Sequence, residues 1–166
     1  MRAGVIQMRS GVVRRENMEA AEALIRQAAA AGAELVLTPE MTTLLDKNRA
    51  RLLAELQEPQ PDEEEIFSAL SRELGLTIII GSAPFLLAGS DKVANRSMVF
   101  AEGLKLASYD KIHLFDVDLD TGESWRESSL YEGGDEAVLV TVPGAKLGLS
   151  ICYDLRFPRL YRQLAQ

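Results

Sequence analysis

The order of apolar and polar residues in the first half of the chain predicts strands and helices that alternate. Short apolar runs typical of buried strands occupy residues 3–8, 34–37 and 76–80. Between the first two runs, residues such as Met18 and Ile25 repeat at the spacing of one helix face, and Gly32 can end that helix. A looser helical pattern covers residues 50–57.

A third helix carries sequence signals at both ends. Asp62 fits its N-cap, with Glu65 three residues later as the capping-box partner. Gly75 is placed to end it, because glycine adopts the left-handed backbone conformation of many helix C-termini. We therefore expect a helix over residues 62–75, separated by two prolines from the helix before it.

The second half of the chain is typical of hairpins separated by a long polar connection. The predicted strand pairs are 92–101 with 104–109, and 137–142 with 146–151. Residues 110–135 lie between the two pairs, and a connection of that length is usually functional or disordered. Pro158 suits the first turn of a final helix. Strand–helix units followed by hairpins indicate a layered α/β fold with a mixed sheet.

Length, composition and charge fit one globular domain. The chain has 166 residues, of which 47% are hydrophobic and 26% are charged. Its formal net charge is −7 and its Lys and Arg residues do not cluster, so we expect no nucleic-acid partner and no membrane partner. No apolar run approaches the ~20 residues that span a bilayer, and the N-terminus turns polar too soon for a signal peptide.

Cysteine and histidine are scarce. Cys152 and His113 are the only residues of their kinds. A single cysteine forms no internal disulfide, which suits a reducing compartment, so we expect a cytoplasmic protein. One cysteine and one histidine also argue against a zinc site built from protein ligands.

Three reactive residues each follow an apolar strand. Glu40, Lys111 and Cys152 all occupy this position. Taken singly, they are ordinary as a loop glutamate, a surface lysine and a small buried hydrophobe. Active-site groups gather at strand ends in α/β folds, and each of the three residues lies at such a strand end. Spacing alone does not show that they converge.

The chemistry of the three groups is complementary. A thiol needs a base to take its proton, and a carboxylate in a pocket of low dielectric constant can serve. Attack of sulfur on an amide or nitrile builds negative charge on oxygen or nitrogen. A fixed ammonium group and a backbone N–H, here that of Tyr153, can stabilise that charge.

Motif-like segments lie at residues 37–41, 109–115 and 148–158, in that order along the chain. Together they resemble the three signature motifs of the nitrilase superfamily of carbon–nitrogen hydrolases. The first strand at 3–8 and the turn at 30–36 are also similar, so the resemblance covers essentially the whole chain. It implies an α-β-β-α sandwich with mixed sheets and a homo-oligomer, usually a dimer that pairs through helices including the one after the cysteine.

The resemblance implies a role for each reactive residue. Glu40 is then the general base, Lys111 the charge stabiliser and Cys152 the nucleophile. The segment around Glu127 matches that of a second glutamate, which holds Lys111 or the substrate in place. In the implied reaction ammonia leaves as a thioester forms on Cys152, and water activated by Glu40 releases the acid. No metal and no organic cofactor is implied.

Residues 111–118 and 152–158 are most similar to the branch that contains omega-amidase and deaminated glutathione amidase. This implies a small-molecule amide substrate, a carboxylate omega-amide such as deaminated glutathione or an alpha-keto acid amide. Amidase, carbamoylase and nitrilase chemistry all stay open. Arg156 is one candidate for binding the substrate carboxylate, and its pairing with Asp154 as a brace is the alternative. For His113 we expect a hydrogen-bonded structural role.

Members of this branch continue beyond the helix that follows the cysteine, whereas this chain ends at Gln166. The prediction is therefore a carbon–nitrogen hydrolase domain over residues 1–166 that is truncated at its C-terminus. A catalytically inactive subunit or an oligomerising fragment of that fold is the alternative function. An unrelated α/β binding module would need a glycine-rich phosphate loop after the first strand, and residues 9–12 do not form one.

Overall fold

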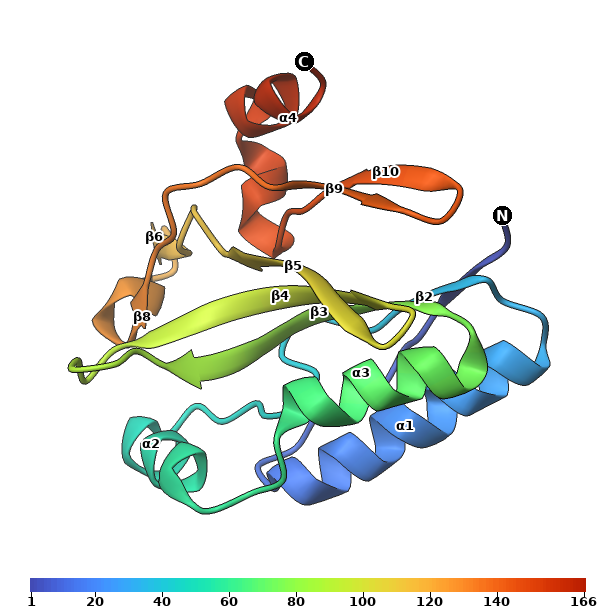
Figure 1. The fold of residues 1–166 in the computed structure, drawn as a ribbon. Coiled ribbons are helices and arrows are strands. Elements are labelled where there is room, and N and C mark those ends of the chain that lie inside the picture. Colours follow the sequence, from blue (N-terminus) through green and yellow to red (C-terminus); the bar gives the residue numbers. More distant parts are fainter.

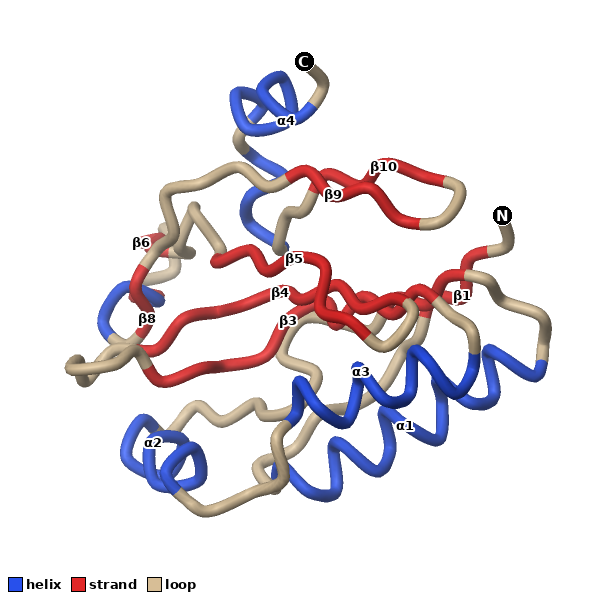
Figure 2. Tube along the Cα trace, viewed as in Figure 1, coloured by secondary structure: helices blue, strands red, loops and turns tan.

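A six-stranded mixed sheet is the centre of the fold in a computed structural model that describes residues 1–166 (Figures 1 and 2). Its strands, in spatial order, are β1 (Ala3–Val5), β2 (Leu35–Leu37), β3 (Thr77–Leu86), β4 (Val93–Ala101) and β5 (Leu104–Asp110), with β8 (Tyr131–Glu132) also paired to β4. The pairs β1–β2, β2–β3 and β4–β8 are parallel, whereas β3–β4 and β4–β5 are antiparallel.

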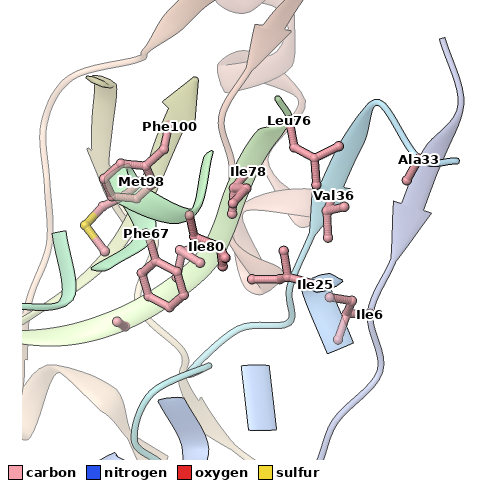
Figure 3. Packing of buried hydrophobic residues seen from close by; sticks show 12 residues of the cluster. Ile6, Ile25, Ala33, Val36, Phe67, Leu76, Ile78, Ile80, Met98 and Phe100 are labelled. Carbon is pink, nitrogen blue, oxygen red and sulfur yellow. The ribbon is translucent and has the colours of Figure 1, made fainter. Parts of the chain in front are cut away.

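Helices α1 (Arg14–Ala30) and α3 (Glu63–Leu74) cover one face of this sheet (Figure 1). Figure 3 shows the core between them, where Ile25 and Phe67 from the helices meet Ile78 and Ile80 of β3. Helix α2 (Arg49–Gln57) packs its Leu52 in a smaller cluster. Burial of these apolar side chains stabilises the helical layer.

The opposite face of the sheet is covered by the antiparallel hairpin of β9 (Leu139–Val142) and β10 (Ala145–Gly148), with α4 (Pro158–Leu164) beyond it (Figure 1). Ile79, between the two isoleucines that face the helices, packs here with Val99 and Val140. Successive residues of a strand point to opposite faces, so one continuous apolar run serves both layers. Helices, sheet, hairpin and helix follow in that order, which confirms the predicted α-β-β-α architecture.

Several predicted boundaries differ from the structure. The strand predicted at 146–151 ends at Gly148, because the Ile151 N–H donates to the Asp154 side chain instead of joining a ladder. The strand predicted at 3–8 ends at Val5. Asp62 caps α3 through the Glu64 N–H, and the predicted capping box with Glu65 does not form.

The polar connection at 110–135 contains short regular elements that the apolar pattern did not reveal. They are β6 (Asp116–Asp118), β7 (Ser124–Arg126), a 3-10 turn called η1 (Glu127–Ser129), and β8. Strands β6 and β7 form a small antiparallel hairpin with mostly exposed side chains. As for membranes, the structure has no helix that combines the length and the apolar character needed to cross a bilayer.

Candidate active site

Glu40 lies on a loop that is hydrogen-bonded to a bulge in β3. The Met41 N–H donates to Ser82 Oγ at 2.9 Å, and the Gly81 N–H donates to Thr38 Oγ1 at 3.1 Å. A Cβ at Gly81 would lie 2.2 Å from the Thr38 carbonyl oxygen, so only glycine allows this approach. The bulge therefore fixes where the chain leaves β2 and where Glu40 stands.

Lys111 follows β5 directly and lies in the interior, with its side chain only 3% exposed. Its N–H donates to the Asn95 carbonyl oxygen at 2.9 Å, which holds the end of β5 against β4. Its ammonium nitrogen lies 3.1 Å from Glu40 Oε1 and 3.0 Å from both Glu127 oxygens. A buried lysine of this kind needs anionic partners, and here it has two.

Glu127 begins the turn η1, and its carboxylate accepts hydrogen bonds from several directions. Besides the two contacts with Lys111, the Phe115 N–H donates to Glu127 Oε2 at 2.6 Å. The Asn95 amide lies 3.4 Å from Glu127 Oε1. Both oxygens of Glu127 are thus occupied by donors of the protein, which fixes its position and holds Lys111 in place.

Cys152 starts a 3-10 turn, η2 (Cys152–Arg156), with a left-handed φ of 45°. Met41, next to Glu40, also has a positive φ of 54°. Such backbone strain in non-glycine residues is uncommon and is concentrated at functional sites. The N–H of Tyr153 donates to no acceptor in the protein, so it is free to bind a ligand atom beside the thiol.

Asp154 anchors η2 from within the core. Its fully buried carboxylate accepts from the Tyr109 hydroxyl at 2.7 Å, from the Ile151 N–H at 2.9 Å and from His113. The His113 ring also stacks on Phe157 with centroids 3.6 Å apart. His113 thus has the structural role predicted for it, whereas the alternative pairing of Arg156 with Asp154 does not form, since the partners of Asp154 are Tyr109, Ile151 and His113.

Charge at this site sets the protonation states of Lys111 and Cys152. Burial lowers the pKa of Lys111, but the charges and hydrogen bonds of Glu40 and Glu127 more than offset burial, so the pKa lies above its ordinary value. Burial raises the pKa of the Cys152 thiol, and Glu40 raises it further while Lys111 opposes the rise. At neutral pH the site therefore holds an ammonium group and a protonated thiol.

Glu40, Lys111, Glu127 and Cys152 all line one open hollow of about 440 Å³. Its lining includes the aromatic side chains of Phe115 and Trp125. It also includes charged residues at and just before the start of α2, namely Asp46, Lys47 and Arg49. Arg156 is not among the lining residues, which leaves it without a place in this hollow. A larger hollow of about 540 Å³ beside Met1 contains none of these groups, so size alone does not mark the site.

The chain is similar in sequence to known proteins. The sequence profile described as carbon-nitrogen hydrolase matches residues 2–166. The chain belongs to the carbon-nitrogen hydrolase family. The chain is 38% identical to a deaminated glutathione amidase of Yersinia enterocolitica, over 96% of the chain and 57% of the relative. It is 35% identical to the human omega-amidase NIT2, over 99% of the chain and 59% of the relative. The chain thus spans somewhat more than half the length of these relatives.

Solved structures agree with the fold of this chain. The C. elegans NitFhit protein superposes with a TM-score of 0.87 at 27% identity, covering 99% of the chain and 42% of that protein. A Saccharomyces cerevisiae member of the nitrilase superfamily superposes with a TM-score of 0.81 at 24% identity, over 98% of the chain and 59% of that protein. The predicted membership of the nitrilase superfamily is confirmed.

Two groups of this site were not predicted from sequence. Asn95 follows the buried apolar residues Val93 and Ala94 in β4, and its amide contacts both glutamates. An asparagine is uncommon inside a buried strand, and that oddity was the available signal. The Phe115 N–H is the second, and no side-chain pattern could reveal a backbone donor. Regarding metals, the structure has no group of three or more His, Cys, Asp or Glu side chains that could hold an ion.

Proposed function

We propose that this chain carries the catalytic groups of a cysteine-dependent amidase that releases ammonia from a small carboxylate omega-amide. The observation that carries the proposal is the contact of one buried ammonium group, Lys111, with two carboxylates in the hollow that also contains Cys152. This arrangement supplies a nucleophile, a proton acceptor and a fixed positive charge within one site. The match to the family and to named amidases supports the same reaction class.

Hydrogen bonding distinguishes the two carboxylates. Both oxygens of Glu127 accept from Lys111 and from other donors, so it is a positioning group. Glu40 accepts from Lys111 and Asn95 through Oε1 alone, and its Oε2 has no donor. The charge of Glu40 also raises the pKa of the Cys152 thiol, which lines the same hollow. We therefore assign Glu40 as the general base.

The first half of the proposed reaction forms a thioester. Cys152 gives its proton to Glu40 while Sγ attacks the amide carbonyl carbon. Negative charge gathers on the carbonyl oxygen, where the Lys111 ammonium group and the Tyr153 N–H stabilise it. The C–N bond then breaks, the Glu40 proton moves to the leaving nitrogen, and ammonia departs.

The second half restores the enzyme. Water gives a proton to Glu40 and attacks the thioester carbon. The C–S bond breaks, the carboxylic acid leaves, and Cys152 regains its proton from Glu40. Because the thiol pKa is raised, the reaction needs this proton acceptor and does not start from a standing thiolate.

The substrate carboxylate needs a cation at the rim of the hollow. Arg49 pairs with Asp91 and Arg126 pairs with Asp118, so both are already neutralised. Lys47 forms no ion pair with a carboxylate and lies over the Trp125 ring, 5.8 Å from its centroid. We therefore assign Lys47, in place of Arg156, as the group that binds a substrate carboxylate.

Transfer of the acyl group to hydroxylamine tests this proposal. A thioester on Cys152 passes its acyl group to hydroxylamine, so wild type mixed with a dicarboxylate monoamide is expected to form the hydroxamate. Cys152→Ala is expected to form none, while Ser150→Ala, changed at an exposed hydroxyl nearby, forms as much as wild type. Equal hydroxamate from wild type and Cys152→Ala would overturn the proposal. Absence of product from a folded wild type would favour the catalytically inactive alternative.

We further propose that the chain forms a homo-oligomer in a reducing compartment such as the cytoplasm. Leu139 is 52% exposed and Leu155 is 72% exposed, on the same layer as α4, and their burial between copies would be favourable. A reducing compartment keeps the Cys152 thiol free for catalysis. Sedimentation of wild type and of Leu155→Glu tests the oligomer, since the variant is expected to shift toward monomer.

A further inference from the structure

Asn95 is fully buried in β4, yet its side chain serves the catalytic groups and not the core. Its Nδ2 donates to Glu40 Oε1 at 2.9 Å and lies 3.4 Å from Glu127 Oε1. Its backbone oxygen accepts from the Lys111 N–H at 2.9 Å. One residue therefore contacts both carboxylates of the proposed site and the backbone of Lys111.

The orientation of the Asn95 amide follows from the charges around it. A carboxylate only accepts hydrogen bonds, so the NH₂ group and not the oxygen of Asn95 must face Glu40 and Glu127. The price is that Asn95 Oδ1 is buried without any partner. Buried polar atoms are nearly always satisfied, and a structural asparagine would satisfy its oxygen. The unpaired oxygen indicates that the amide is selected for its two donors.

We propose that Asn95 is a positioning residue that keeps Glu40 Oε1 occupied, so that Oε2 is the atom that takes the proton of the Cys152 thiol. This inference rests on the proposed function of Glu40 as the general base. The amide also bridges two carboxylates that would otherwise repel each other.

The same donor helps Glu40 to give its proton back. Hydrogen bonds from Asn95 and Lys111 stay on Oε1 while Oε2 takes and returns the proton. Glu40 must be ionised to accept the thiol proton and must then release it to the leaving nitrogen. A donor that neither gains nor loses a proton itself supports both steps at every working pH.

The charged and titratable groups that face Glu40 come from four elements. They are Lys111 after β5, Glu127 of η1, Tyr131 of β8 and Cys152 of η2. All four remain when Asn95 is changed. A change in pH dependence in an Asn95 variant would thus report the lost amide donor.

The test compares Asn95→Leu, which keeps the approximate size but has no donor, with Ser97→Ala on the same strand. Ser97 is buried, its hydroxyl donates to the Ile80 carbonyl oxygen at 3.0 Å, and it forms no hydrogen bond with Glu40, Lys111 or Glu127. The rate of Cys152 alkylation by iodoacetamide is measured across pH, which needs no amide substrate. Ammonia release from a dicarboxylate monoamide gives kcat and KM, and thermal melting reports folding.

For Asn95→Leu we expect the acid limb of the alkylation profile, where the rate falls as pH is lowered, to shift to higher pH. The expected shift is about half a pH unit or more, a threefold change in proton concentration. We expect kcat to fall at least about tenfold with little change in KM. Ser97→Ala is expected to keep both the wild-type profile and the wild-type kcat. If Asn95→Leu does not fold, Asn95→Ser replaces it.

The inference would be overturned if a folded Asn95 variant showed its acid limb at the wild-type pH. It would also be overturned if Asn95→Leu and Asn95→Ser both failed to fold, since Asn95 would then be a structural residue. Wild type that releases no ammonia would instead overturn the proposed function. In that case the alkylation profile alone still decides whether Asn95 acts on Glu40.

Discussion

The Tyr109 hydroxyl donates a hydrogen bond of 2.7 Å to Asp154 Oδ2 inside the core. Tyr109 lies two residues before Lys111, and Asp154 lies two residues after Cys152. This bond therefore ties the strand that presents the ammonium group to the turn that presents the thiol. Two segments more than forty residues apart in sequence are held in register at the site by a pair of side chains that touch no substrate.

Tyr109→Phe removes this bond and leaves the buried Asp154 with fewer donors. Loss of a hydrogen bond to a buried charged group costs about 1–3 kcal/mol, so we expect a lower midpoint of denaturation. We also expect kcat to fall more than KM rises, since the thiol and the ammonium group lose their shared anchor. Chemical denaturation and steady-state kinetics measure both effects.

Tyr161→Phe is the matched control, because its hydroxyl bonds Ser150 at the surface. It is expected to match wild type in stability and in kcat. A Tyr109→Phe protein with wild-type kinetics would show that the site does not depend on the Asp154 anchor.

Gly81→Ala tests the bulge that places Glu40. The new Cβ would lie 2.2 Å from the Thr38 carbonyl oxygen, so the loop must move away from β3. Overpacking of this kind costs about 1–3 kcal/mol, and the shifted loop takes Glu40 with it. We expect lower stability and loss of most of the amidase activity, measured by melting and by ammonia release.

Gly11→Ala serves as the control, since a Cβ there has its nearest neighbour at 3.7 Å and the backbone is unstrained. It should retain activity and stability. Full activity of Gly81→Ala would mean that the position of Glu40 is set by something other than the bulge.

The thiol pKa of Cys152 is expected to shift in opposite directions when Glu40 and Lys111 are replaced. The absorbance of the Cys152 thiolate is expected to appear with a midpoint above the ordinary value of about 8.5. Glu40→Gln removes a negative charge near the thiol, so the midpoint moves down. Lys111→Met removes a positive charge, so the midpoint moves up. A pH titration of thiolate absorbance gives the midpoint for wild type, Glu40→Gln and Lys111→Met.

Glu40→Gln carries a second, sharper consequence. Its thiol ionises more easily, yet the variant has no proton acceptor, so amidase activity is expected to be lost as the thiolate fraction rises. A variant whose activity rises with its thiolate fraction would contradict the role of Glu40 as general base.

Lys47→Gln tests how the substrate carboxylate is bound. Loss of one charge-assisted hydrogen bond predicts a KM about tenfold higher for a dicarboxylate monoamide, with kcat nearly unchanged. A neutral amide of the same length is expected to be unaffected. Lys146→Gln, a lysine of the β9–β10 hairpin outside the hollow, controls for the change in net charge. Equal KM values for Lys47→Gln and wild type would remove Lys47 from the substrate site.

Much of the fold could be predicted because burial dictates residue type along β3 and α3. The apolar run at Ile78–Ile80 must be covered on both faces, and the left-handed Gly75 ends α3 as predicted. The hairpin of β6 and β7 could not be predicted, because its strands are short, polar and exposed. Without a buried face, they have no alternation of apolar residues for a pattern to reveal.

The site divides in the same way. Glu40, Lys111 and Cys152 could be picked out because each follows an apolar strand, and the structure brings all three to one hollow. The positions of Asn95 and Asp154 at the site could not be predicted, because both act through contacts with residues far away in sequence. Such contacts depend on the register of β4 and β5 and on the turn η2, which local spacing does not specify.

Ammonia release from a dicarboxylate monoamide by wild type, Cys152→Ala and Glu40→Gln tests the central claim most directly. We predict release by wild type, and a loss of more than about a thousandfold in both variants, with melting curves close to that of wild type. Release by Cys152→Ala at the wild-type rate would contradict the proposal that Cys152 is the nucleophile of an amidase reaction.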